Sequence, residues 1–413
     1  MTPADYLETR RGELLDVLTR LVRVETVNPP GADYDQITRM LTEELKQSGL
    51  KARRLAVPAA QLKAVLPPEQ HAFPRFNVLG LWPVRGARKT LHFNAHYDVV
   101  PVSGTWAHGS PFSGAVEGGW IYGRGTGDMK GSIASLLLAL RALRATGHTP
   151  RMNVEVSFTA DEETDSLLGS GWLVQHAPIQ PDFAVVMEGG EGDAVCCGHN
   201  GVVWLEVVVH GRAAHGSKPE AGINALEKMA ALVLALEDHK RELAKRPFRT
   251  PEGKTMYPTL NVGGVFSQSP GGKINTVPAD ARFSIDRRVL AIESVARAEK
   301  ELRAFLSRAA RSIPDCRITV NKISDNHPCY SEPAHPFFAA MADAVRAVRG
   351  GKPVFNVSAG FNDMHFFSHY LKIPTLGYGP GGQRYHAVDE RARVTDLLGC
   401  AKIYARLLME FGG

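Results

Sequence analysis

The sequence predicts an α/β fold: a discontinuous domain with a mostly parallel central sheet, interrupted by a compact insert. Three observations support this prediction. Up to about residue 199, short apolar runs of strand type alternate with amphipathic helical stretches, as in a parallel sheet. Over residues 200–320 the predicted order becomes β-α-β-β-α-β, which is the order of a split ferredoxin-like unit. The α/β pattern then resumes over residues 321–413.

The first segment, residues 1–199, supplies most of the predicted sheet. Apolar residues recur at helical spacing in three stretches, the last of which stops at Gly147, and this periodicity predicts amphipathic helices. Runs of apolar and β-branched residues between them predict strands. The predicted helices are 6–24, 34–48 and 129–146, and the predicted strands are 76–81, 91–95, 154–158 and 183–187.

The insert and the last segment are assigned in the same way. The insert has predicted strands at 202–209, 259–266, 281–289 and 317–323, with helices at 223–243 and 293–311. In the last segment, helices at 334–348 and 394–411 flank a short strand at 373–378. Insertion of one domain into another requires chain ends that lie close together. We therefore expect residues 1–199 and 321–413 to form one domain and residues 200–320 another.

Composition excludes several functional classes. The 413 residues carry 48 Lys and Arg against 43 Asp and Glu, a net charge of +5, with no dense basic block of the kind that nucleic-acid binding needs. No run approaches the ~18–20 apolar residues of a membrane span, and the N-terminus lacks a signal-type apolar stretch. Five cysteines without metal-ligand spacing indicate free thiols in a cytoplasmic protein. The adjacent Cys196 and Cys197 leave a redox role as the less favoured alternative.

Histidine and carboxylate side chains stand where predicted strands end. In an open α/β sheet, ligands bind at the carboxyl ends of the strands, so these side chains are placed to converge there. Two further candidates lie in glycine-rich loops, residues 123–128 and 377–386. The candidates are His96, Asp128, Glu162, Glu163, Glu188 and His386.

The chemistry of this set favours metal ions. Two histidines with three or more carboxylates and no thiolate suit Zn²⁺, with Co²⁺ or Mn²⁺ as alternatives. The negative charge of three carboxylates exceeds the positive charge of one divalent ion. With two such ions and a bridging hydroxide, the three carboxylates give a site of zero net charge. Charge counting therefore predicts two metal ions, about 3.5–4 Å apart and bridged by a carboxylate.

Spacing suggests roles for the neighbouring residues. His96 and Asp98 are two residues apart, so on an extended segment they share a face and Asp98 can orient the imidazole. Glu162 and Glu163 point apart if their backbone is extended, so that one binds metal and the other acts as general base. Taken singly, each residue is also consistent with an ordinary sheet-end histidine or a solvated acidic turn. Gly123–Gly127 lacks the Gly-Lys-Ser/Thr ending of a phosphate loop.

Five segments together resemble a known family. HFNAHYDVVP, GRGTGDMKG, TADEETDS, VVMEGG and RYHAVDE are similar, in the same order, to segments of the dinuclear zinc metallopeptidase and deacylase family that includes acetylornithine deacetylase, succinyl-diaminopimelate desuccinylase, aminoacylase and glutamate carboxypeptidase. The helical start, the insert and the final helix extend the resemblance over nearly the whole chain. It implies a catalytic domain with an inserted lid or dimerisation domain.

The resemblance also implies a role for each residue. Asp128 bridges the two metal ions, His96 and Glu188 bind one, and Glu163 and His386 bind the other. Glu162 becomes the general acid/base and Asp98 the residue that orients His96. In the insert, His215 of Gly211–Ser217 stabilises the oxyanion, often from the partner subunit of a homodimer, and Asn261 and Arg288 contact the substrate carboxylate. Arg287 competes with Arg288 for that role.

Two segments depart from the family pattern. Thr164–Ser170 is not the commonest glycine-rich form, and Phe361–Asp363 replaces a smaller loop that carries a hydroxyl group. We expect both to line the substrate side chain, so the resemblance does not fix the substrate.

The expected function is metal-dependent hydrolysis of an amide bond in an N-acyl amino acid or small peptide, as by a deacetylase, desuccinylase or carboxypeptidase. A metal-bound water activated by Glu162 attacks the carbonyl, the metals and His215 stabilise the oxyanion, and Glu162 protonates the departing amine. One alternative is a dinuclear-metal aminopeptidase or dipeptidase that requires a free amine. Another, from a different class, is a non-catalytic protein that binds an amino-acid derivative.

Overall fold

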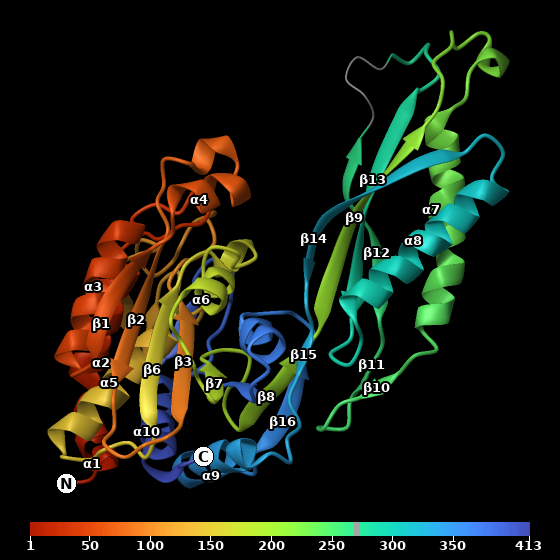
Figure 1. Ribbon diagram of the computed structural model, residues 1–413. Coiled ribbons are helices and arrows are strands. Elements are labelled where there is room, and N and C mark those ends of the chain that lie inside the picture. The colour runs from red at the N-terminus through yellow and green to blue at the C-terminus, as the bar shows by residue number, and fades with distance from the viewer. Residues whose placement is uncertain (268–272) are drawn as a thin grey trace. The chain divides into compact units, whose positions relative to one another are not determined.

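The computed structural model describes residues 1–267 and 273–413, and the chain folds into two compact units. The larger unit comprises Met1–Gly198, Ser331–Asn356 and Asn362–Gly413. The insert unit comprises His199–Tyr330 with the return segment Val357–Phe361. The predicted fold class, an α/β domain with a mostly parallel sheet and a separate inserted sheet domain, is confirmed (Figure 1).

The centre of the larger unit is a mixed sheet with strand order β1-β2-β6-β3-β7-β17-β8. The pairs β6–β3, β3–β7 and β7–β17 are parallel, whereas β1–β2, β2–β6 and β17–β8 are antiparallel. The parallel core therefore carries antiparallel strands at both edges. The strands are β1 Lys51–Ala56, β2 Phe76–Trp82, β3 Thr90–His96, β6 Asn153–Thr159, β7 Phe183–Val186, β8 Ala194–His199, β16 Val354–Ser358 and β17 Thr375–Gly377.

Edge strand β1 is an element that hydrophobic periodicity did not predict. Its sequence, KARRLA, carries three basic residues and no regular alternation. Basic residues protect an exposed edge from pairing with other chains, and only β2 pairs with β1 within the described residues. A small separate sheet of β18-β5-β4 was also missed because its strands are three residues each: β4 Ala115–Glu117, β5 Trp120–Tyr122 and β18 Arg391–Arg393.

Helices lie on both faces of the central sheet, with α6 in front of it and α10 behind it in Figure 1. α5, whose apolar residues are buried, packs on β3 and on α10. No helix of the described chain meets the length and apolarity of a membrane span. The helices are α1 Pro3–Glu8, α2 Arg11–Val22, α3 Tyr34–Gln47, α4 Ala59–Val65, η1 Pro68–Gln70, α5 Lys130–Ala145, η2 Glu162–Thr164, α6 Ser170–His176, α9 Pro336–Arg349, η4 Phe366–Tyr370 and α10 Val394–Glu410.

The first predicted helix, 6–24, is two helices in the structure. A capping box between Thr2 and Asp5 starts α1, and α1 ends at Glu8. The Thr9 hydroxyl donates to the Tyr6 carbonyl at 2.9 Å, which satisfies one of the last carbonyls of α1 and favours termination there. Of the apolar residues whose spacing predicts this helix, Leu18, Leu21 and Val22 of α2 are buried, whereas Leu15 is half-buried.

The insert unit contains an antiparallel sheet of order β12-β13-β9-β14, the strand order of a ferredoxin-like unit, as predicted. Alternate residues of β9 and β13 pack with α7 and α8 into one apolar core, which includes Leu205, Phe283 and Leu302. The unit's elements are β9 Gly201–His210, η3 Pro219–Ala221, α7 Ala225–Leu243, β10 Phe248–Arg249, β11 Thr255–Met256, β12 Thr259–Ser267, β13 Asp280–Val289, α8 Val295–Ser312, β14 Arg317–Asn326 and β15 Cys329–Tyr330.

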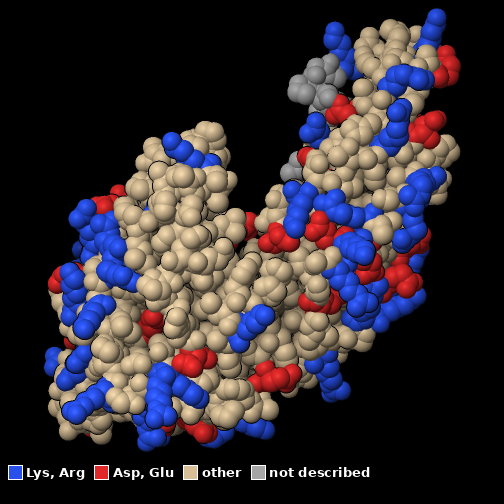
Figure 2. All heavy atoms as spheres, in the orientation of Figure 1, with Lys and Arg blue, Asp and Glu red and all other residues tan. Residues whose placement is uncertain are grey.

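Charged side chains of both signs lie intermixed over α8 of the insert unit (Figure 2). Glu299 accepts from Arg303 at 2.8 Å and pairs with Lys322 at 3.1 Å, and Arg246 pairs with Glu301 at 2.8 Å. Such exposed pairs contribute little to stability, about 0–1 kcal/mol each. Their effect is to balance the charge of this face.

The fold of the insert unit depends on the apolar face of α7. Leu232 is fully buried in the core, whereas Leu234, two residues on, is 72% exposed. We expect Leu232→Ala to lower the free energy of unfolding of the insert unit by about 2–5 kcal/mol, because it removes packed methyl groups and leaves a cavity. The matched control Leu234→Ala should change it by less than about 0.5 kcal/mol. Calorimetry and urea titration of both variants measure the difference, and equal losses would contradict the assigned face.

Candidate metal centre

Three neighbouring parallel strands bring the candidate side chains to one edge of the central sheet. His96 is the last residue of β3 and pairs in register with Thr159, the last residue of β6. β6 runs on into Glu162 and Glu163, and β7, the other neighbour of β3, ends at Val186, two residues before Glu188. The parallel direction of these strands makes their carboxyl ends coincide, as predicted.

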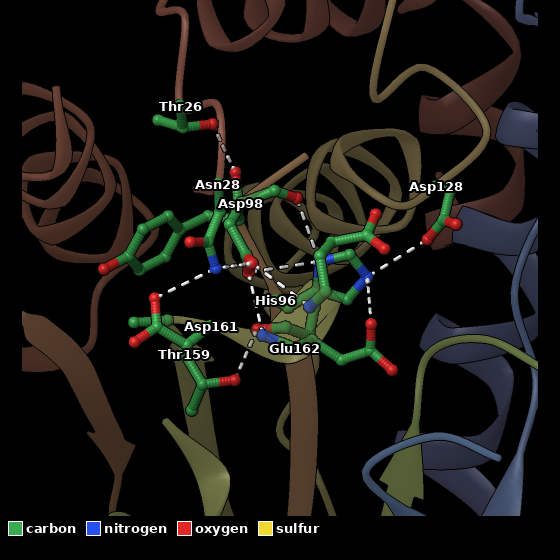
Figure 3. Close-up of polar contacts among 12 residues, drawn as sticks. Thr26, Asn28, His96, Asp98, Asp128, Thr159, Asp161 and Glu162 are labelled. Atoms are coloured by element: carbon green, nitrogen blue, oxygen red, sulfur yellow. Dashed lines mark hydrogen bonds and ion pairs between the residues drawn. The ribbon is translucent and has the colours of Figure 1, made fainter. Parts of the chain in front are cut away.

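Asp128 lies between two histidines, one on each of its carboxylate oxygens. His96 Nε2 is 3.0 Å from Oδ1 (Figure 3), and His386 Nε2 is 3.2 Å from Oδ2. Glu188 lies on the His96 side, 3.8 Å from Nε2, and Glu163 lies on the His386 side, 3.3 Å from Nε2. Potential ligand atoms of His96, Asp128 and Glu163 all lie within 4.8 Å of one another. The geometry thus contains two adjacent groups of ligands that share one carboxylate.

Glu162 lies on the His96 side, with its carboxylate 3.9 Å from Nε2. The backbone at Glu162 and Glu163 is not extended, so the condition under which neighbouring side chains point apart is not met. Asp161 has φ 62°, in the left-handed region, and begins a 3-10 turn. The chain turns at Asp161, just after β6, so Glu162 and Glu163 lie in a tight turn. Their side chains still face different histidines.

Asp98 holds both His96 and this turn. His96 Nδ1 is 3.0 Å from the Asp98 main-chain oxygen and 3.5 Å from its carboxylate. The carboxylate instead accepts the main-chain N–H groups of Glu162 and Glu163, each at 3.2 Å. The main-chain carbonyl is therefore the nearer partner of the imidazole, which differs from the expected carboxylate contact. The carboxylate fixes the position of the two glutamates.

A buried glutamate that the sequence did not single out supports the Asp128 loop. Glu390 is fully buried, and its Oε1 accepts the N–H groups of Gly125, Gly127 and Asp128 at 3.0–3.1 Å. Arg124 donates to Oε2 at 2.6 Å. The only sequence signal is an acidic residue four positions after His386. Its partners lie more than 260 residues away in the chain, so periodicity cannot reveal them.

A second buried network supports the turn at Asp161. Arg75, which is fully buried, donates to both carboxylate oxygens of Asp161 at 2.8 and 3.0 Å. Tyr34 donates to Asp161 at 3.0 Å, and Asn28 donates to both Asp98 and Asp161 (Figure 3). Burial raises the pKa of Asp161 to about 6 despite the nearby Arg75 guanidinium. The sequence analysis did not single out Asn28.

The electrostatics of the cluster fit divalent cations. Burial raises the pKa of Glu188 to about 7. Burial also raises the pKa of Glu163, and burial together with repulsion by Glu188 raises the pKa of Glu162. Hydrogen bonds to Asp128 and Glu163 raise the pKa of His386 to about 10. In the described part of the chain, no Lys or Arg pairs with these carboxylates, and Glu188 Oε1 is buried without a hydrogen-bond partner. The negative charge therefore lacks a permanent cation, and the N and O donors suit a metal.

The remaining predicted site residues belong to the insert unit. His215 is exposed and contacts Ser217 at 2.7 Å. Asn261 is exposed on β12. On β13, Arg287 is fully buried and pairs with Glu293 at 3.0 Å, whereas the Arg288 side chain is 33% exposed. The Arg288 guanidinium is the less buried of the two, and it donates from Nε and Nη2 to Asp286 at 3.2 and 3.0 Å.

Comparisons with known proteins place the chain beside metallopeptidases. Residues 92–410 match peptidase family M20/M25/M40. A succinyl-diaminopimelate desuccinylase of Bradyrhizobium sp. (strain BTAi1) is 28% identical over 407 residues, covering 96% of this chain and 98% of that protein.

Solved structures show the same fold. The M20 family metallo-carboxypeptidase Sso-CP2 from Sulfolobus solfataricus superposes with a TM-score of 0.75 at 21% identity, covering 96% of this chain and 98% of that chain. A dinuclear metal binding peptidase of the M20 family from Bacillus subtilis superposes with a TM-score of 0.69 at 14% identity, covering 97% and 98%.

The shared position of Asp128 leads to a test of metal content. We expect the purified protein, dialysed against Zn²⁺, to retain two ions per chain. Asp128→Ala should retain fewer than one, because both ligand groups lose a member, whereas His386→Ala should retain about one. Mass spectrometry of the metal content measures this, with His148→Ala, which removes an exposed histidine, as the control. Two retained ions in Asp128→Ala would exclude the shared role.

Proposed function

The chain belongs to peptidase family M20/M25/M40, and on that premise we propose that it cleaves the amide bond of an N-acyl amino acid or small peptide with Glu162 as general base. Membership makes it a metallohydrolase that acts on acyl-amino acids or peptides. The observation that carries the finer proposal is the position of Glu162, beside two ligand groups that share Asp128.

We assign His96 and Glu188 to one metal ion and Glu163 and His386 to the other, with Asp128 shared. The distances from each histidine to its own glutamate and to its own oxygen of Asp128 support this division. Zn²⁺ is the proposed ion, with Co²⁺ or Mn²⁺ as alternatives. When bound, the ions supply polarisation of the scissile carbonyl and a lowered pKa for the attacking water.

Glu162 moves the proton in this proposal. Burial, together with the charge of Glu188, raises the pKa of its carboxyl well above the usual value, so it can accept a proton from water and release it again near neutral pH. The oxygen of that water forms the new bond to the carbonyl carbon, and the C–N bond breaks. Glu162 then delivers its proton to the departing amine nitrogen. Asp98 keeps Glu162 in place by accepting its main-chain N–H.

The insert unit is proposed to recognise the substrate. His215 would donate to the oxyanion, and Asn261 and Arg288 would bind the substrate carboxylate. The exposure of His215 and Asn261 and the partial exposure of Arg288 support this assignment, and the burial of Arg287 argues against the competing arginine. A homodimer formed through the insert unit belongs to the same proposal, as does an N-succinyl or N-acetyl amino acid as substrate, by analogy with the desuccinylase relative.

Substituting Glu162 and Glu163 one at a time distinguishes the proposed general base from the proposed metal ligand. We expect Glu162→Gln to keep two ions per chain while kcat falls about 10²–10⁴-fold, because only proton transfer is lost. Glu163→Gln, one residue on, should lose both turnover and one ion. Steady-state kinetics with metal analysis of both variants tests this, and near-normal kcat in Glu162→Gln would refute the base assignment.

The substrate class is tested with matched pairs of compounds. A panel of N-succinyl and N-acetyl amino acids, together with dipeptides whose amine is free or acetylated, should be hydrolysed where the amine is acylated. Release of the free amino acid, measured by ninhydrin or mass spectrometry in the presence of Zn²⁺ and separately of Co²⁺, gives kcat/KM for each. Preference for the free amine would establish the aminopeptidase or dipeptidase alternative.

A further inference from the structure

The turn that carries Glu162 and Glu163 has an unusual backbone. Asp161, Asp165 and Ser166 have φ of 62°, 76° and 54°, and side-chain-bearing residues disfavour this left-handed region. Such conformations persist where the surroundings over-determine them, often at functional sites. We call residues 161–166 the catalytic turn. The contacts that hold its backbone therefore bear on what fixes the position of Glu162.

The catalytic turn is closed on itself by its own backbone. The Asp161 carbonyl accepts the N–H groups of both Thr164 at 3.1 Å and Ser166 at 2.7 Å. Asp98 holds the middle of the turn through the amides of Glu162 and Glu163. Because a closed turn moves as one piece, a shift of Ser166 carries Glu162 with it.

A second buried carboxylate holds the other end of the catalytic turn. The Ser166 hydroxyl donates to Oδ1 of Asp363, and the Ser170 hydroxyl donates to Oδ2 at 2.6 Å. All three side chains are at most 2% exposed. In the described chain no Lys or Arg is paired with Asp363, so these hydroxyls are its hydrogen-bond donors. The two segments in which the sequence departs from the family pattern therefore bind each other. Whether these segments also line the substrate side chain stays a prediction.

Asp363 itself is well anchored and lies at a junction of the chain. It is two residues beyond Phe361, where the return segment of the insert unit ends. Its neighbour Asn362 accepts the Met364 N–H at 3.0 Å and lies so close to Gly189 that a methyl group there would be 3.0 Å from Nδ2. The segment thus abuts both the catalytic turn and the residue that follows Glu188.

We propose that Asp363 is a positioning residue for Glu162: it clamps the Ser166 end of the catalytic turn while Asp98 clamps the middle. The same contact ties the turn to the point where the chain returns from the insert unit. The proposal rests on the proposed role of Glu162 and adds a residue outside the proposed set of metal ligands.

Two serine substitutions form a matched pair for the test. Ser166→Ala and Ser170→Ala each remove one hydroxyl from the same carboxylate. The Ser170 hydroxyl also accepts a hydrogen bond from Asn94 Nδ2 at 3.1 Å, so Ser170→Ala removes at least as many hydrogen bonds as Ser166→Ala. Ser170, however, begins α6 and lies outside the catalytic turn. Asp363→Ala and the double variant Asp363→Ala/Ser166→Ala complete the set. Ser166→Ala keeps the test decisive if Asp363→Ala does not fold.

Amide hydrogen exchange of the zinc-loaded protein is the first readout. We expect exchange in the peptide covering residues 160–168 to accelerate about tenfold in Ser166→Ala and Asp363→Ala, and to stay near the wild-type rate in Ser170→Ala. Kinetics on the N-acyl amino acid that the wild type hydrolyses best is the second readout. Misplacement of a catalytic group by about 1 Å can lower the reaction rate 10²-fold. In Ser166→Ala and Asp363→Ala we therefore expect kcat to fall at least about tenfold, with KM and metal content unchanged. The double variant should be no slower than either single variant.

Three outcomes would overturn the proposal. These are unchanged exchange in Ser166→Ala, equal loss of kcat in Ser170→Ala and Ser166→Ala, or additive losses in the double variant. Failure of the wild type to hydrolyse any N-acyl amino acid would refute the proposed function instead. The exchange measurement would still decide whether Asp363 holds the turn.

Discussion

The two carboxylate oxygens of Asp128 each contact the Nε2 atom of a different histidine. The site is arranged around this shared carboxylate. Three glutamates lie beside the histidines in a buried region where like charges repel strongly. Burial raises the pKa of Glu188 to about 7, and hydrogen bonds to Asp128 and Glu163 raise the pKa of His386 to about 10. Divalent cations would offset the same negative charge, so binding of the proposed ions would be coupled to proton release.

Holding such a cluster requires polar groups that are themselves buried and fully used. Glu390 accepts three main-chain N–H groups of the Asp128 loop, and Arg75 neutralises Asp161 at the start of the catalytic turn. Each of these groups would be costly to bury alone, and each is offset by partners from a distant part of the chain. Precision at the site thus depends on contacts that are non-local in sequence and contribute no ligand of their own.

This dependence explains what the sequence could predict. The parallel strands and the insert were predictable because hydrophobic periodicity is local, and His96 and Glu188 could be placed because they follow such strands. Glu390, Arg75 and Asn28 could not be found, since each acts through partners 70 to 266 residues away. The 3-10 turn at Glu162 was missed because no local pattern marks the left-handed backbone of Asp161, whose side chain is held by the distant Arg75 and Tyr34. The assignment of Glu163 and His386 to the same metal ion came from the family resemblance and not from spacing, and the two side chains lie 3.3 Å apart.

The distribution of roles between the two units has a further consequence. Every proposed metal ligand and the proposed base lie in the larger unit, whereas His215, Asn261 and Arg288 lie in the insert unit. In the proposed function, metal binding and proton transfer are therefore assigned to the larger unit and contacts to the substrate to the insert unit, so we expect substitutions in β12 or β13 to change specificity without disturbing the carboxylate cluster. The chain crosses between the units close to residues that support the site, because Asp363 follows the return segment directly. The proposed clamp at Asp363 therefore lies within two residues of this crossing, and it links the proposed base to the chain segment that connects the two units.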